Sequence, residues 1–299
     1  MSIATNEMIF GPGGNSDAFY AQGHKRTVET FAWQQQFGLK AFEYSMGRGI
    51  SLKEESAAQI GEAAKEAGVA LSVHAPYYIN LASDSPDTRE KSIAYITRSA
   101  RMLKLMGGSR LVVHPGSPQK QRREEARRRC REALAEAREA LEAEGLGEII
   151  LCLETMGRPS QMGTLEEILD FVLLDASFLP CIDFAHLHAA SGGGLQTAAD
   201  FEAVLDLTEA RLGMDRARRM HIHFSRIEYG SKGELRHRIF AEEDYGPDHE
   251  PLMVLLAHRH YAATLICESR GTMAEDAAVM RQAYEREKSI MMNEKGARV

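Results

Sequence analysis

The feature that most constrains the fold is a repeated alternation of short apolar runs with longer amphipathic segments. The predicted strands are Met8–Phe10, Ala41–Tyr44, Leu71–His74, Arg110–His114, Ile149–Glu154, Pro180–Asp183, Arg219–His223 and Thr264–Glu268. The predicted helices lie near Lys25–Phe37, Leu52–Ala67, Asp87–Met106, Arg122–Ala143, Leu165–Leu174, Ala198–Leu212, Pro251–Arg259 and Met273–Lys288. Strands that alternate with helices of this length predict βαβ units and a parallel sheet.

Eight strand–helix pairs in 299 residues fit one (β/α)8 TIM barrel of the α/β class. We therefore expect a single domain over residues 1–299, with a functional site at the C-terminal face of the barrel. A six-stranded Rossmann-like sheet is the alternative. The chain has neither a G-x-G-x-x-G fingerprint after the first strand nor a G-x-x-x-x-G-K-[ST] loop, and both absences favour the barrel.

Composition and charge exclude several classes of protein. The chain is 44% hydrophobic with mixed charge, which excludes intrinsic disorder. It has no apolar run near the roughly 20 residues that span a bilayer, and no secretory signal is expected. The four cysteines lack C-x-x-C spacing, so we expect reduced thiols in a cytoplasmic protein. A net charge of −7 argues against a generally basic surface without excluding a local basic groove.

Side chains that can bind metal ions end each of the last six predicted strands. They are His74, His114, Glu154, Asp183, the pair His221 and His223, and Glu268. In a closed barrel the C-terminal strand ends converge on one opening, so these side chains would meet there. Imidazoles with carboxylates suit Zn²⁺, and Mn²⁺ competes where carboxylates dominate. More ligands are present than one ion needs, so we expect two or three ions, an arrangement suited to phosphoester hydrolysis.

Strand alternation places Cys152 on the same face as Glu154, and Cys181 on the same face as Asp183. Small inward side chains below carboxylates suit a narrow barrel interior. We therefore expect both cysteines to serve in packing.

Short motifs surround these strand ends. In chain order they are His74-Ala75-Pro76-Tyr77-Tyr78-Ile79-Asn80-Leu81-Ala82, Val113–Ser117, Leu153–Thr155, Asp183–Gly192, His221–Ser225 and the segment ending at Glu268. They resemble, in the same order, the H-x-x-Y-x-I-N-L-A, F-H-P-G-S, L-E-N/T, D-x-x-H-x-x-A-A-G, H-x-N-D-S and L-E-T motifs of the endonuclease IV family of apurinic/apyrimidinic endonucleases. The resemblance covers roughly residues 71–271.

The resemblance implies a trinuclear zinc site. One ion would be held by His74, His114 and Glu154, and a second by the bridging Glu154 with Asp183, His221 and Glu268. A third ion would use His186 and a D-x-H pair, of which His237 is present, while Leu235 replaces the Asp. His223 or Glu234 could supply a substitute ligand, and a two-metal site is the alternative.

The resemblance also implies the substrate, which is duplex DNA with abasic sites. Metal-activated hydroxide would cleave the phosphodiester 5′ to the lesion, with Glu154 and Glu268 as catalytic carboxylates. Tyr77 matches the family's tyrosine near the flipped nucleotide, and Arg48 is a weaker candidate for contact with the DNA gap. The family resemblance favours a monomer.

Two other functions are compatible with the pattern. A sugar isomerase or epimerase of related barrels would need one divalent metal, held by Glu154, Asp183, His221 and Glu268. His74 and His114 favour the nuclease, because a single-metal sugar enzyme does not need them. A non-catalytic protein that binds damaged DNA or a partner is the third hypothesis, and the nearly complete ligand set disfavours it.

Overall fold

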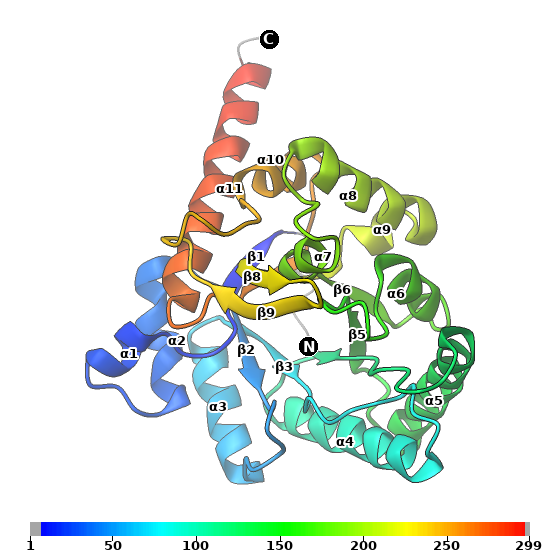
Figure 1. Cartoon of the computed structure of the whole chain (residues 1–299). Coiled ribbons are helices and arrows are strands. Elements are labelled where there is room, and N and C mark those ends of the chain that lie inside the picture. The colour runs from blue at the N-terminus through cyan, green and yellow to red at the C-terminus, as the bar shows by residue number, and fades with distance from the viewer. Residues whose placement is uncertain (1–6, 297–299) are drawn as a thin grey trace.

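Eight parallel strands form a ring at the centre of the molecule (Figure 1), in a computed structural model that describes residues 7–296. Their order around the ring is β1-β10-β7-β6-β5-β4-β3-β2. Their bounds are Ile9–Pro12 (β1), Ala41–Ser45 (β2), Ala70–His74 (β3), Arg110–Val113 (β4), Ile150–Glu154 (β5), Leu179–Asp183 (β6), His221–Phe224 (β7) and Thr264–Cys267 (β10). Every pairing in this sheet is parallel. The predicted TIM barrel is confirmed.

The ring closes where β1 approaches β2. The Lys40 N–H donates a hydrogen bond of 3.0 Å to the Phe10 carbonyl. Gly11 permits this approach, because a Cβ atom there would lie 1.9 Å from the Ala41 carbonyl oxygen. Closure places the C-terminal ends of all eight strands around one opening.

Helices cover the outside of the ring (Figure 1). Their bounds are Asp17–Ala21 (α1), Thr30–Gln34 (α2), Glu54–Glu66 (α3), Pro86–Leu105 (α4), Arg123–Ala143 (α5), Leu165–Val172 (α6), Phe184–Ala190 (α7), Ala198–Leu212 (α8), Met214–Ala217 (α9), Glu250–His258 (α10) and Met273–Gly296 (α11). In α4 the apolar residues Ile96, Ala100 and Leu103 recur at helical spacing and are fully buried against the barrel. Within residues 7–296, no helix is both long enough and apolar enough to cross a membrane.

The helix predicted over Lys25–Phe37 is wrong in detail. The segment folds as α2 between two short 3₁₀ helices, Thr27–Glu29 and Gln35–Phe37. The Glu29 carboxylate accepts hydrogen bonds from the backbone N–H groups of Lys25 and Arg26, at 2.9 and 2.7 Å. These bonds hold Arg26 in an extended conformation, so helical structure begins only after it.

Small and medium side chains fill the barrel interior below the opening. One cluster contains Val112, Cys152, Leu179 and Cys181, all buried. The expectation that both cysteines face inward is confirmed. The chain's four cysteines are all buried and unpaired.

An antiparallel hairpin follows β7 and lies across the barrel opening beside α7 (Figure 1). Its strands are Arg226–Gly230 (β8) and Gly233–Arg238 (β9). No strand is predicted in this segment from the sequence. Its formation as a hairpin fixes the side chains of β9 over the strand ends.

Candidate metal centre

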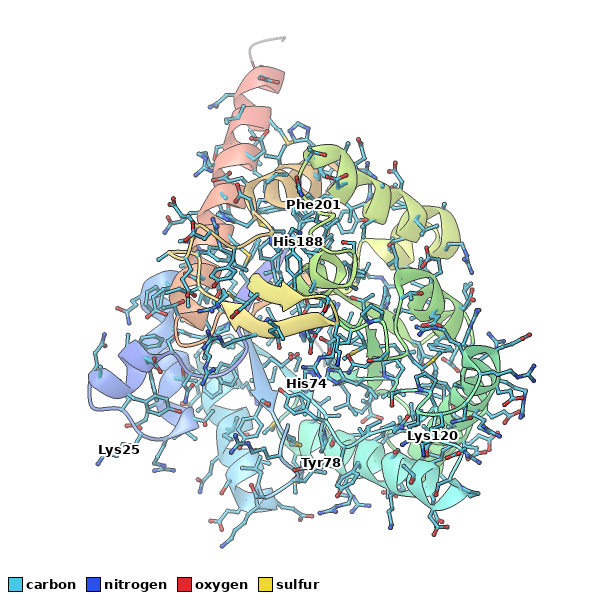
Figure 2. The ribbon with its side chains drawn as sticks, in the orientation of Figure 1. Lys25, His74, Tyr78, Lys120, His188 and Phe201 are labelled. Carbon is cyan, nitrogen blue, oxygen red and sulfur yellow. The ribbon has the colours of Figure 1, made fainter. Side chains whose placement is uncertain are left out.

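The polar strand ends converge on the opening of the barrel, as expected. His74, Glu154 and Asp183 are the last residues of β3, β5 and β6. Figure 2 shows His74 near the centre of the opening, beside the hairpin. Four groups of possible metal ligands, each with its ligand atoms within 4.8 Å of one another, occur among the described residues. Three of these groups lie at the opening.

The first group contains His74, His114 and Glu154. The Glu154 Oε2 atom lies 3.0 Å from the Nε2 atom of His74 and 2.9 Å from that of His114. His74 Nδ1 lies 2.8 Å from the carbonyl oxygen of Ala75. This hydrogen bond places a proton on Nδ1, so Nε2, which faces Glu154, is the nitrogen that would bind a cation in place of its own proton.

Burial and charge oppose each other in this group. Burial alone would lower the pKa of His74, but the carboxylates of Glu154, Glu43 and Glu268 outweigh it and raise that pKa to about 9. Burial would raise the pKa of Glu154, but His114 and His223 hold it well below its usual value. The opening therefore concentrates buried carboxylates that attract positive charge.

The second group contains Glu154, Asp183, His223 and Glu268. His223 Nδ1 lies 3.3 Å from Glu154 Oε1 and 3.6 Å from Glu268 Oε1. His221 is expected in this group, but the strand register pairs His223 with Asp183 and pairs His221 with Cys181. His221 therefore lies one step deeper in the barrel.

The third group contains Asp183, His186 and His237. Asp183 caps α7, and its Oδ1 atom accepts a hydrogen bond of 2.8 Å from the His186 backbone N–H. The Asp-x-x-His spacing thus brings the two side chains together at the start of one helix. His237 reaches the group from β9, and its Nδ1 atom lies 2.7 Å from the Ser225 hydroxyl.

The hairpin also supplies the carboxylate that Leu235 lacks. Glu234 Oε2 lies 2.9 Å from His186 Nε2, whereas the Leu235 side chain is 59% exposed. Burial opposes ionisation of Glu234, but His186 and His237 lower its pKa to about 2. Gly157 makes room for the carboxylate, because a Cβ atom there would lie 2.3 Å from Glu234 Oε2.

Two carboxylate oxygens at the opening lie where the ligands of a shared cation would lie. Asp183 Oδ2 and Glu234 Oε2 are buried and have no hydrogen-bond partner. Each nevertheless lies within 3.2 Å of a His186 ring nitrogen. Buried polar atoms in native proteins are normally hydrogen-bonded, so such unpaired oxygens beside imidazoles fit a site that holds cations.

Glu43 is a buried acid that the sequence reasoning missed. It lies in the middle of β2, faces the barrel interior and is 1% exposed. Its carboxylate accepts a hydrogen bond of 2.8 Å from the Ser72 hydroxyl and lies 3.1 Å from His221 Nε2. The sequence feature that identifies Glu43 is its place as a charged residue between two aromatic residues, Phe42 and Tyr44, in a predicted buried strand.

The two predicted substrate-binding residues lie at the rim of the opening. The Tyr77 ring stacks on His114 with centroids 5.5 Å apart, and the residue is 56% exposed. Arg48 follows β2 and is exposed, with its carbonyl oxygen 3.5 Å from the Tyr78 hydroxyl. Both residues are therefore accessible to a ligand that approaches the metal groups.

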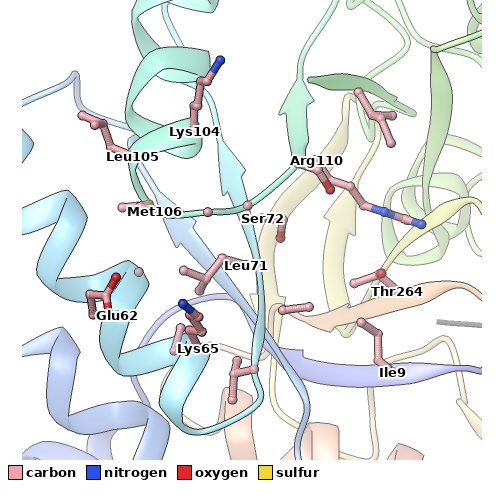
Figure 3. Close-up of a pocket in the computed structure, with 18 of the residues that line it drawn as sticks. Ile9, Glu62, Lys65, Leu71, Ser72, Lys104, Leu105, Met106, Arg110 and Thr264 are labelled. Carbon is pink, nitrogen blue, oxygen red and sulfur yellow. The ribbon is translucent and has the colours of Figure 1, made fainter. Parts of the chain in front are cut away.

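A cavity of about 650 Å³ lies at the opposite end of the barrel (Figure 3). Its lining includes Ile9, Arg110 and Thr264, which lie at the N-terminal ends of their strands. Arg110 donates hydrogen bonds to the carbonyl oxygens of Met220 and Arg219 and so helps to close this end of the barrel. None of the four ligand groups found in residues 7–296 lines this cavity.

The family described as xylose isomerase-like TIM barrel matches residues 31–286. An uncharacterized protein of Methanocaldococcus jannaschii is 32% identical over 277 residues, which cover 93% of this chain and 97% of that protein. A probable endonuclease 4 of Acholeplasma laidlawii is 30% identical over 183 residues. That match covers 58% of this chain and only 60% of the relative.

Solved structures with the same fold include both nucleases and sugar enzymes. Endonuclease IV from Thermus thermophilus has a TM-score of 0.67 at 22% identity and covers 94% of this chain and 98% of its own. A D-tagatose 3-epimerase-like protein has a TM-score of 0.67 at 19% identity, and the match covers 96% of this chain and 99% of that protein. These likenesses support the fold alone.

Proposed function

The chain belongs to the xylose isomerase-like TIM barrel family, and from that premise we propose that it is a zinc-dependent endonuclease that cleaves DNA 5′ to abasic sites. The observation that carries the proposal is the linkage of three ligand groups at one opening. Glu154 belongs to the first and second groups, and Asp183 belongs to the second and third. A single-metal enzyme needs only one of these groups.

The residues of the opening fit three divalent ions. The proposed ligands are His74, His114 and Glu154 for the first ion, Glu154, Asp183, His223 and Glu268 for the second, and Asp183, His186, Glu234 and His237 for the third. Imidazole and carboxylate ligands suit Zn²⁺, with Mn²⁺ as the alternative. When bound, such ions would lower the pKa of a water molecule and stabilise the leaving oxygen of an in-line displacement.

Two carboxylates are proposed as catalytic. Glu154 is 1% exposed and lies between four imidazoles, so it would hold the groups at fixed spacing. Glu268 is 21% exposed, and it faces His223 and His237 at 3.6 and 3.7 Å. The exposed part of Glu268 would orient the attacking water and accept its proton.

Two rim residues are proposed to bind the nucleic acid. Tyr77 offers an exposed ring above the first group, and aromatic rings stack on bases and sugars freed from the duplex. Arg48 would contact a phosphate. The proposal places the protein in DNA repair in the cytoplasm, acting as a monomer on duplex DNA with abasic sites.

A sugar isomerase or epimerase is the second candidate. The second group alone offers four ligands to one divalent ion. The TM-score of 0.67 is the same for the epimerase-like structure and for endonuclease IV, so the fold does not separate the two functions. Under this alternative, His74 and His114 would be dispensable for catalysis.

Incision of a labelled duplex carrying one abasic analogue tests the proposal, with the undamaged duplex and a panel of keto-sugars as controls. We expect a single cut 5′ to the analogue by the zinc-loaded protein. His114→Ala should abolish the cut, because it removes a ligand of the first group only. Turnover of a keto-sugar by the fully loaded protein without any incision would overturn the proposal.

A further inference from the structure

A second type of ligand cluster lies inside the barrel, below the opening. It contains Cys181 on β6 with His221 and His223 on β7, and one ligand atom of each lies within 4.8 Å of the others. The parallel register pairs Cys181 directly with His221. All three residues are 0% exposed. The cluster is therefore sealed from solvent, unlike Glu268 at the opening.

Hydrogen bonding leaves one nitrogen of His221 free. Its Nε2 atom lies 3.1 Å from Glu43 Oε2 in hydrogen-bond alignment, and the Ser72 hydroxyl donates to the same oxygen. An ionised carboxylate can only accept, so Nε2 carries the proton and Nδ1 carries a lone pair. That Nδ1 atom is buried and has no hydrogen-bond partner, which is uncommon in a native interior unless an ion or a water completes the site.

His223 connects the cluster to the opening. Its Nδ1 atom faces Glu154 and Glu268, whereas its Nε2 atom lies 3.0 Å from Glu43 Oε1. That second approach lacks hydrogen-bond alignment, so Nε2 counts as unpaired. The ring thus offers one nitrogen to each level of the barrel.

We propose that Cys181, His221 and His223 bind a separate structural cation deep in the barrel. One thiol with two imidazoles favours zinc or another thiophilic cation and disfavours magnesium and calcium. Glu43 would orient His221 and offset part of the positive charge, as carboxylates behind metal-bound histidines do. On binding, the Cys181 thiol would lose its proton, and His223 would lose its remaining ring proton when both of its nitrogens hold cations. This role goes beyond the packing expected from the sequence, and it does not depend on the reaction at the opening.

Cobalt substitution tests the deep site, because a thiolate bound to Co²⁺ gives a near-ultraviolet charge-transfer band and the groups at the opening contain no sulfur. The full chain, stripped of metal and reloaded with Co²⁺, should show this band. Cys181→Ser should lose the band and one equivalent of bound metal. Cys152→Ser is the matched control and should keep both, because Cys152 is equally buried on the neighbouring strand but lies outside the ligand groups.

Two results would overturn the inference. One is a cobalt-loaded wild-type protein with occupied sites at the opening and no thiolate band, and the other is a band that survives in Cys181→Ser. If that variant does not fold, X-ray absorption of the zinc-loaded wild type decides, since the site requires one sulfur about 2.3 Å from zinc. The variant His114→Ala should retain the band, which separates this inference from the proposed nuclease.

Discussion

Replacement of Glu234 by glutamine is the sharpest probe of the third metal group. The change keeps the size of the side chain and removes one negative charge that lies 2.9 Å from His186 Nε2. Two unit charges about 4 Å apart interact by about 4 kcal/mol at an effective dielectric constant near 20. Glu234 is 20% exposed, so solvent screens part of this. We expect the third ion to lose about 3 kcal/mol of binding free energy, which corresponds to roughly 100-fold weaker binding.

Zinc titration in a metal buffer, followed by single-turnover incision of abasic duplex, measures this loss. We expect the weakest zinc equivalent of Glu234→Gln to shift by roughly 100-fold, with a parallel fall in the incision rate. Leu235→Ala is the matched control and should leave both unchanged, because that side chain faces solvent. If Glu234→Gln binds every zinc equivalent with wild-type affinity, the assignment of Glu234 as a ligand is refuted.

Three further results are expected. Leu103→Ala removes a fully buried side chain between α4 and the barrel and should lower the free energy of unfolding by about 2–5 kcal/mol in urea denaturation. Tyr77→Ala should raise the KM for abasic duplex by about tenfold through lost stacking, whereas Tyr77→Phe should not. Burial opposes ionisation of Glu167, but Arg123 and the backbone N–H groups of Gly163 and Thr164 together lower the pKa of Glu167 below 4.5. The stability that the ionised carboxylate contributes should therefore be complete above that pH and be lost as the pH falls through the lower folded pKa. Urea denaturation across this range should show a smaller loss of stability in Glu167→Gln than in wild type.

Much of the fold follows from local sequence patterns. Apolar runs mark all eight barrel strands, and the helical spacing of the apolar residues in α4 marks the face of that helix that packs on the strands. A Ser or Thr three residues before a Glu predicts a capping box, and Thr164 with Glu167 forms one at the start of α6. Ser51 and Glu54 have the same spacing but form no box, because α3 begins at Glu54 with Lys53 as its cap.

The site is harder to predict wherever it depends on contacts distant in sequence. Alternation places His221 and His223 on the same face of β7, and only the register with β6 shows that His223 lies level with Asp183. Glu234 is positioned by a hairpin that folds back over the opening, and motif spacing points instead to Leu235. Glu43 lies in mid-strand, away from the strand ends where a barrel site is expected.

Anomalous diffraction at the zinc edge tests the central claim most directly, because it counts and places the ions at the opening. Three zinc peaks are expected there, one within each group, with Glu154 and Asp183 each between two of them. A single peak, held by Glu154, Asp183, His223 and Glu268 in crystals grown with excess zinc, would contradict the multinuclear nuclease and favour a single-metal sugar enzyme.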